Sequence, residues 1–163
     1  MKQLLLPSIL TLLLFSSCGI FKKVEKSDNA LPAAFADIKF GMTESMASSI
    51  RTAMEKQDQQ FDFRQVYMEE SPGENINYAV YYFDADDNKP LYEVIIEYPD
   101  IQSRDAAAAA LLGPPNQGGE WYFEKKWEYP IKAWVFKNKL VIAALIPNTE
   151  WYEEAQKGVD DWK

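Results

Sequence analysis

Apolar and polar positions along the chain predict one helix and three strands in its first half. Met46, Ile50 and Met54 recur at helical spacing after Phe40, and Thr43 can cap the N-terminus of this helix. Further on, runs rich in β-branched and aromatic residues predict a strand and then a hairpin. These runs cover residues 60–68, 75–83 and 91–98.

The same order of elements returns in the second half. Ser103 can cap a helix of strong helix formers, and Gly113, Pro114 and Pro115 end it. Strand-like runs follow at residues 119–128, 130–136 and 140–146. We therefore expect an α+β fold with two helix–strand–hairpin repeats, about residues 38–98 and 99–147, in one antiparallel sheet of about six strands with the helices on one face.

Alternation in the strand at residues 91–98 assigns its side chains to two faces. Tyr92, Val94, Ile96 and Tyr98 would face the core, and Glu93 and Glu97 would face water. Two carboxylates can also serve a glycosidase, but that reaction needs them on opposite sides of a cleft. Because simple alternation explains the pair, we expect no catalysis here.

Aromatic residues crowd the C-terminal third of the chain. In residues 119–128, Trp121, Phe123 and Trp127 would lie in the core beneath the second helix. Tyr122, together with Trp134 from the next strand, would then lie on the helix-free face. Aromatic residues ringed by charge are typical of binding surfaces, so the predicted partner-binding residues are Tyr122, Trp134, Glu93 and Glu97.

The N-terminus has the layout of a secretory signal. Residues 1–17 combine Lys2, an apolar stretch too short to span a membrane and small residues before Cys18. Residues 15–18 resemble the lipobox of bacterial lipoproteins, in which the cysteine becomes the lipidated first residue. We expect a signal peptide (1–17), a lipidated tether (18–34) and one domain (35–163); the alternative is that Cys18 is only a small apolar residue of an N-terminal helix.

Charge and composition exclude several classes of function. The formal charge is 17 − 25 = −8, and it becomes 16 − 25 = −9 without residues 1–17, which argues against a nucleic-acid partner. The absence of histidine excludes Ser–His and Cys–His dyads and the commonest metal ligand. Residues 149–157, with Thr149 as the cap, predict a short C-terminal helix that packs Trp151 onto the sheet.

One loop has the spacing of a calcium site. Asp84, Asp86 and Asn88 could offer oxygen ligands at positions one, three and five of such a loop. Lys89 stands where glycine is required and Ile95 where glutamate is required, so a polar hairpin loop is the preferred interpretation and we expect no metal or other cofactor.

Two short motifs carry a family resemblance. The helix start at residues 40–43 (FGMT) and the helix end at 112–115 (LGPP) resemble those of the superfamily that includes the SmpA/OmlA lipoproteins of the β-barrel assembly machine and the β-lactamase inhibitor protein. Residues 54–57 lack the Gly-Pro closure in the first repeat. The resemblance implies a non-enzymatic binding module.

Together these patterns predict a lipid-anchored envelope protein, expected in the outer membrane facing the periplasm, that binds another envelope protein. The alternatives are a carrier or sensor for a small ligand, and a hydrolase that uses carboxylates alone.

Overall fold

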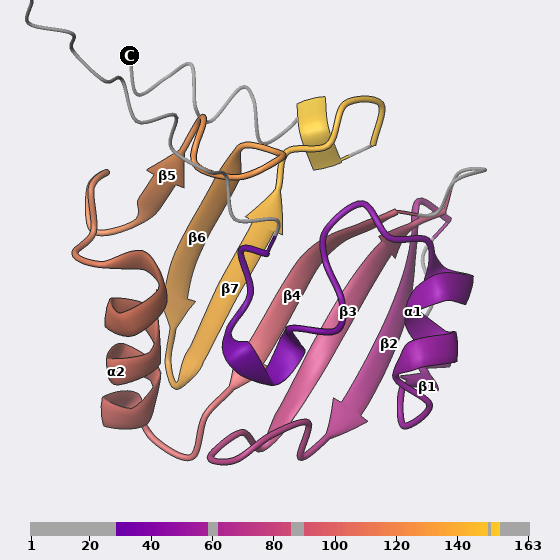
Figure 1. Cartoon of the computed structure of the whole chain (residues 1–163), viewed down its shortest axis with the longest axis horizontal. Helices are drawn as coiled ribbons and strands as arrows, with labels where there is room; N and C mark the ends of the chain where they lie inside the picture. Colours follow the sequence, from indigo (N-terminus) through magenta and orange to yellow (C-terminus); the bar gives the residue numbers. More distant parts are fainter. Residues whose placement is uncertain (1–28, 59–61, 86–89, 150, 154–163) are drawn as a thin grey trace, which may run out of the picture.

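A computed structural model describes residues 29–58, 62–85, 90–149 and 151–153. The predicted signal peptide, Cys18, Asp86 and Asn88 lie outside these residues, as does the end of the predicted C-terminal helix. Figure 1 shows a single sheet with helices alongside it. The elements are η1 (Ala33–Phe35), α1 (Glu44–Ile50), β1 (Glu55–Lys56), β2 (Arg64–Glu70), β3 (Tyr78–Asp84), β4 (Leu91–Glu97), α2 (Ile101–Leu112), β5 (Trp121–Phe123), β6 (Ile131–Phe136) and β7 (Lys139–Ala144).

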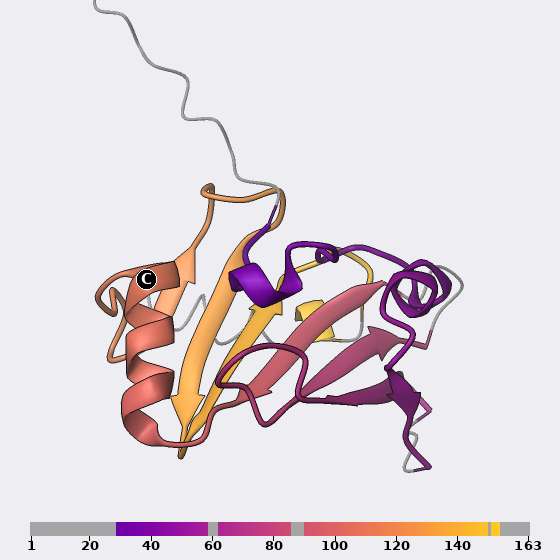
Figure 2. The same ribbon diagram turned by 60° about the horizontal axis from the view of Figure 1, so that its bottom comes forward.

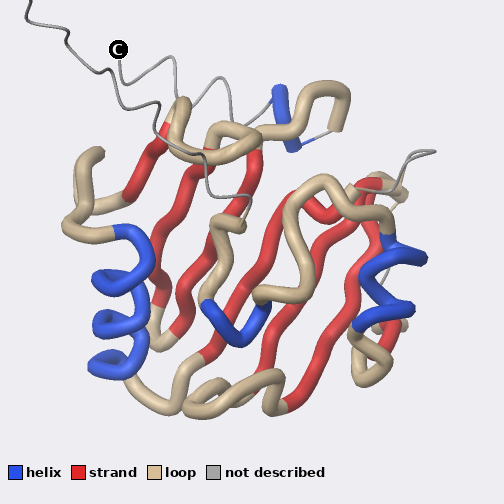
Figure 3. The backbone as a smooth tube through the Cα atoms, viewed as in Figure 1, coloured by secondary structure: helices blue, strands red, loops and turns tan. Residues whose placement is uncertain are grey.

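The sheet confirms the predicted α+β fold. Its order is β1-β2-β3-β4-β7-β6-β5, and every neighbouring pair is antiparallel (Figure 3). Each half of the chain contributes a helix followed by a three-stranded meander, and the halves meet where β4 pairs with β7. The two-residue strand β1 is a seventh strand, beyond the six or so expected.

The helices η1, α1 and α2 pack on one face of this sheet, which we call the helix-bearing face (Figure 2). Glu44 of α1 accepts a hydrogen bond from the Tyr67 hydroxyl, and Phe35 of η1 meets the ring of Tyr81 edge-on. Beside α2, the indole of Trp121 donates to the Gly113 carbonyl at 2.9 Å. One row of paired positions across this face illustrates the core: Tyr67, Tyr81, Val94, Ile142, Ala133 and Trp121.

Helix α1 is shorter than its apolar spacing predicts. Thr43 is its cap, as expected, but the helix ends at Ile50, before Met54, and the apolar residues Met46 and Ile50 are 51% and 45% exposed. The hydroxyls of Ser48 and Ser49 donate to backbone carbonyls of the preceding turn. Such bonds compete with the helical ladder. Arg51 then leaves helical geometry at φ −102° and ψ 79°.

The second helix begins earlier than predicted. Asp100, not Ser103, is its cap, because the Asp100 carboxylate accepts a hydrogen bond from the Ser103 backbone N–H at 2.7 Å. The predicted end is confirmed at Gly113, whose φ of 76° favours glycine.

Strand β5 covers only three residues of the predicted run 119–128. Trp121 and Trp127 are nevertheless buried as predicted, and Phe123 packs edge-on against Trp127. The outer edge of β5 is closed by Asn116. Its side-chain amide accepts from the Tyr122 backbone N–H at 2.8 Å and donates to the Tyr122 carbonyl at 2.9 Å.

Candidate functional site

The helix-free face carries an apolar row where a solvated sheet face would carry polar residues. The register places side chains from five neighbouring strands directly beside one another. This row, which we call the apolar row, is Met68, Val80, Ile95, Val141 and Trp134. The face therefore has the composition of a surface that is covered, at least in part, by other groups.

Part of that cover is supplied by the chain itself. Trp151 stacks on Tyr92 at 6.4 Å and on Trp134 at 6.1 Å between ring centroids. Because β7 lies between the strands that carry Tyr92 and Trp134, Trp151 lies over β7. Val141 and Ala143 of β7 are accordingly buried. The prediction that Trp151 packs onto the sheet is confirmed.

Tyr92 is buried as predicted, at 3% exposure, but it lies on the helix-free face rather than beneath the helices. The register of β3 and β4 shifts between Tyr82 and Phe83, so Tyr92 has no partner of its own in the pairing. Such a bulge turns the extra residue out of the alternation. Tyr92 instead stacks on Tyr82, with centroids 6.4 Å apart, and extends a row of four rings across the helix-free face.

A cation stands at each end of this aromatic row. The Arg64 guanidinium lies 4.3 Å from the ring centroid of Tyr82, and the Lys132 ammonium lies 5.8 Å from that of Trp134. Both distances fall in the range of cation–π attraction. The row thus combines stacking in its interior with positive charge at its ends.

Glu93 lies on this face but does not face water as predicted. Its residue is only 7% exposed, because it stands between Tyr82 of β3 and Ala143 of β7, next to the bulge at Tyr92. Burial raises the pKa of Glu93 from 4.5 to about 7, and the charge of nearby Arg64 offsets this only in part. A carboxyl with this pKa changes its charge near neutral pH.

The other predicted partner residues also lie on the helix-free face. Glu97 is half-buried and forms an ion pair with Lys139 at 3.4 Å. The hydrogen bond with the phenol of Tyr78 is the largest cause that lowers the pKa of Glu97 below its usual range, and burial opposes it. Tyr122 packs on Leu145. Alternation therefore brought Glu93, Glu97, Tyr122 and Trp134 to one surface.

A groove of about 480 Å³ opens on the same face over β2 and β3. Val66, Met68, Val80 and Tyr82 form its floor, and Gln57, Asp58 and Arg64 stand at its rim. The interpretation of the sequence patterns did not predict this groove. Its signal is in the run 78–83 (YAVYYF), which is apolar at odd and even positions alike and therefore predicts two covered faces.

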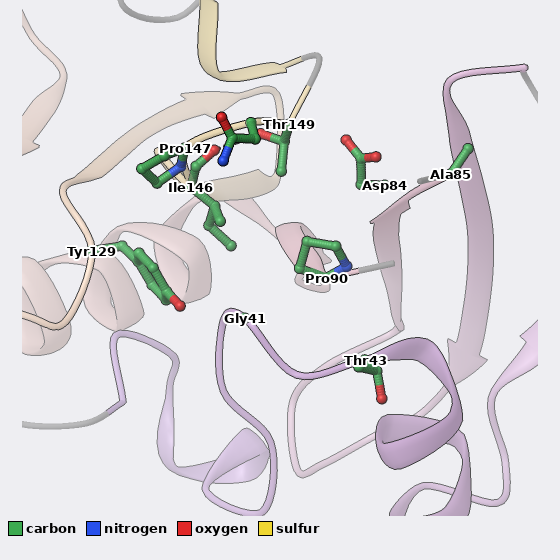
Figure 4. A pocket seen from close by; sticks show the side chains of 10 residues that line it. Gly41, Thr43, Asp84, Ala85, Pro90, Tyr129, Ile146, Pro147 and Thr149 are labelled. Carbon is green, nitrogen blue, oxygen red and sulfur yellow. Dashed lines mark hydrogen bonds between the residues drawn. The ribbon is translucent and has the colours of Figure 1, made fainter. Parts of the chain in front are cut away.

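A second, larger pocket lies at the end of the sheet. Its volume is about 750 Å³, and Figure 4 shows the side chains that line it. Four separate segments contribute: the loop at Gly41 and Thr43, the residues around Asp84 and Pro90, Tyr129, and the turn after β7. No period along the sequence could reveal this pocket, because its parts are far apart in the chain.

The described residues hold no cluster of three or more potential metal ligands, and no helix among them is long and apolar enough to cross a membrane. Asp84 is 2% exposed and lines the large pocket. Comparisons with protein-family models, with curated protein sequences and with solved structures find no match.

Proposed function

We propose that this protein is a lipid-anchored, non-enzymatic module of the bacterial cell envelope, held at the membrane by Cys18, that binds another envelope protein through its helix-free face. The observation that supports this most is the apolar row from Met68 to Trp134. Trp151 covers the part of the row over β7 and β6, whereas an open groove of about 480 Å³ remains over β2 and β3.

The edges of the sheet favour docking on the face over addition of a strand. At one edge, the Asn116 side chain forms hydrogen bonds with both the backbone N–H and the carbonyl of Tyr122. At the other, β1 has only Glu55 and Lys56, both exposed. Short or charged edges and edges closed by side chains disfavour pairing with another strand.

The groove selects the chemistry of its partner. Its floor is apolar, so it favours an apolar side chain, and desolvating about 100 Å² of such surface contributes roughly 2.5 kcal/mol. Arg64 at the rim carries positive charge above Tyr82. A partner segment with an apolar side chain followed by a carboxylate matches both features.

Photo-crosslinking in cells tests the binding face. A photoreactive residue in place of Met68, which lies in the groove, should give one dominant crosslinked protein. The same residue in place of Ile101, which is exposed on α2, is the matched control and should not. The Val80→Lys substitution should abolish the Met68 crosslink, whereas Ala109→Lys on α2 should leave it intact. A crosslink equally strong from both faces would refute the proposal.

The anchor needs a separate measurement. The intact mass of membrane-extracted protein should correspond to a chain that begins at Cys18 and carries acyl groups. Cys18→Ala should remain unmodified and leave the membrane fraction, since acyl chains supply about 0.8 kcal/mol of membrane affinity per methylene. An unmodified wild-type mass would remove the lipoprotein part of the proposal and leave the binding face to be judged by crosslinking.

A further inference from the structure

The large pocket has walls that are already held in place. The Gly41 N–H donates to the Leu91 carbonyl at 2.9 Å, and the Leu91 N–H donates to the Met42 carbonyl at 2.7 Å. On the other side, the Thr149 hydroxyl donates to the Ile146 carbonyl at 2.8 Å. A cavity of about 750 Å³ with fixed walls has the size of small-molecule sites.

Gly41 shows how closely one wall is fitted. Its φ is +85°, and a Cβ placed there would stand 2.8 Å from the hydroxyl oxygen of Tyr129. Only glycine therefore allows the loop to lie against this ring. The loop therefore lies close against Tyr129, one of the polar groups of the pocket.

The chemistry of the lining points to a class of ligand. Its hydrogen-bonding side chains are spread around the cavity: Thr43, Asp84, Tyr129, Asn148 and Thr149. Figure 4 shows the Asp84 carboxylate directed toward the Thr149 side of the cavity. Asn148 adopts a left-handed backbone with φ 68°, which asparagine tolerates better than most residues.

The residues of the lining also argue against other classes of ligand. Among the residues that the structure describes, the lining holds no lysine or arginine, and Asp84 would repel an anion. Asp84 is the one carboxylate in the described part of the lining, and no group of three or more His, Cys, Asp or Glu side chains that could hold a metal lies among the described residues. The apolar surfaces of Pro90, Ile146 and Pro147 suit the C–H face of a ring.

We propose that this pocket binds a small neutral polyhydroxylated molecule, a monosaccharide or a similar polyol, with the Asp84 carboxylate and the Asn148 amide bonded to its hydroxyl groups. A carboxylate and an amide oxygen accept hydrogen bonds from hydroxyls, and the amide N–H₂ and the Tyr129 phenol can donate to them. This site is distinct from the groove on the helix-free face, so it adds a small-molecule ligand to the proposed partner.

Saturation-transfer NMR with the full chain tests this proposal. The probes are glucose, mannose and N-acetylglucosamine, each at up to roughly 10 mM, with ethylamine and acetate as the cationic and anionic alternatives. At least one sugar should bind. Asp84→Asn should weaken that binding roughly tenfold, and Asn148→Ala several-fold, because each removes a hydrogen-bonding group to the ligand.

The control variant is Glu97→Gln, which removes a carboxylate from the helix-free face and should leave sugar binding unchanged. If Asp84→Asn does not fold, the exposed Asn148→Ala decides the question. Absence of binding by every sugar, binding by ethylamine or acetate alone, or sugar binding that survives both substitutions would each overturn the proposal. None of these outcomes bears on the Met68 crosslink, so the two proposals fail separately.

Discussion

The guanidinium of Arg51 pairs with both carboxylate oxygens of Glu69, at 2.7 and 3.2 Å, and both residues are buried. The same guanidinium donates to Asp37 at 2.6 Å, and the Tyr81 hydroxyl donates to Glu69 at 2.6 Å. Arg51 stands at the end of α1 and Glu69 on β2. The pair therefore joins the end of the first helix to the sheet.

Arg51→Ala should lower the free energy of unfolding by about 3–5 kcal/mol, because it leaves the Glu69 charge buried without its cation. Urea denaturation followed by circular dichroism measures this change. The matched control is Lys39→Ala, which breaks the exposed ion pair with Glu128 and should cost less than about 1 kcal/mol. Equal losses of stability in the two variants would show that the buried Arg51–Glu69 pair stabilises the fold no more than an exposed ion pair does.

Glu93→Gln should change how stability depends on pH. The pKa of Glu93 is about 7 in the folded chain against 4.5 ordinarily, so the fold favours the protonated carboxyl. The contribution of Glu93 to the stability of the fold is complete below pH 4.5 and is lost as the pH rises through 7. Above pH 8 the glutamine variant should be more stable than wild type by about 3 kcal/mol, and near pH 4 the two should agree. Denaturation curves across this range measure the difference.

Glu97→Gln is the control, because its effect on the stability near neutral pH should have the opposite sign. The pKa of Glu97 is lowered in the fold, mainly by the hydrogen bond with Tyr78, so its contribution is present above its ordinary pKa and lost in acid. This variant should therefore be somewhat less stable than wild type at neutral pH. A Glu93→Gln variant whose stability followed the wild-type pH profile would contradict the burial of an ionisable carboxyl there.

The order of helices and strands could be predicted because the spacing of the apolar residues and the positions of the residues that end helices indicate the same boundaries. Gly113 ends α2 where the pattern stops, and β-branched runs form the strands. The end of α1 could not be predicted, since Arg51 leaves the helix to reach Glu69, a residue 18 positions away. Tertiary contacts of this kind override a weak helical period.

The candidate site was predictable only in part. Alternation placed Glu97, Tyr122 and Trp134 on the helix-free face, and it failed at Tyr92 because a single-residue bulge moves a side chain to the other face. The same failure hid the burial of Glu93, which stands between Tyr82 and Ala143, next to the bulge at Tyr92.

Trp151→Ala should lower the free energy of unfolding by about 2 kcal/mol, less than the 3–5 expected for a fully buried tryptophan, because this side chain is half-buried. It should also expose Val141 and Ala143 of β7. Guanidinium denaturation measures the stability. Phe136→Ala removes an exposed ring from β6 and should change the stability by less than about 0.5 kcal/mol. A Trp151 variant as stable as this control would mean that the indole adds nothing to the sheet.

Asn116→Ala should open the outer edge of β5. The Tyr122 backbone N–H loses the acceptor that it has at 2.8 Å, so its amide hydrogen should exchange with solvent roughly tenfold faster or more. Hydrogen exchange followed by NMR measures this rate. Gln117→Ala, one residue along, should leave it unchanged, because the bonds of Gln117 with Glu120 are formed by backbone atoms. Unchanged exchange in Asn116→Ala would rule out its role as an edge cap.

The pairing of β4 with β7 has a consequence for the biogenesis of the protein. The centre of the sheet joins a strand from the middle of the chain to the last strand that the structure describes, residues 139–144. Until that strand emerges, β4 presents an open edge with Val94, Ile95 and Ile96 on its two faces. Open apolar edges aggregate readily, so an arrested or truncated chain that lacks β7 should depend on chaperones, whereas the complete chain closes the edge itself.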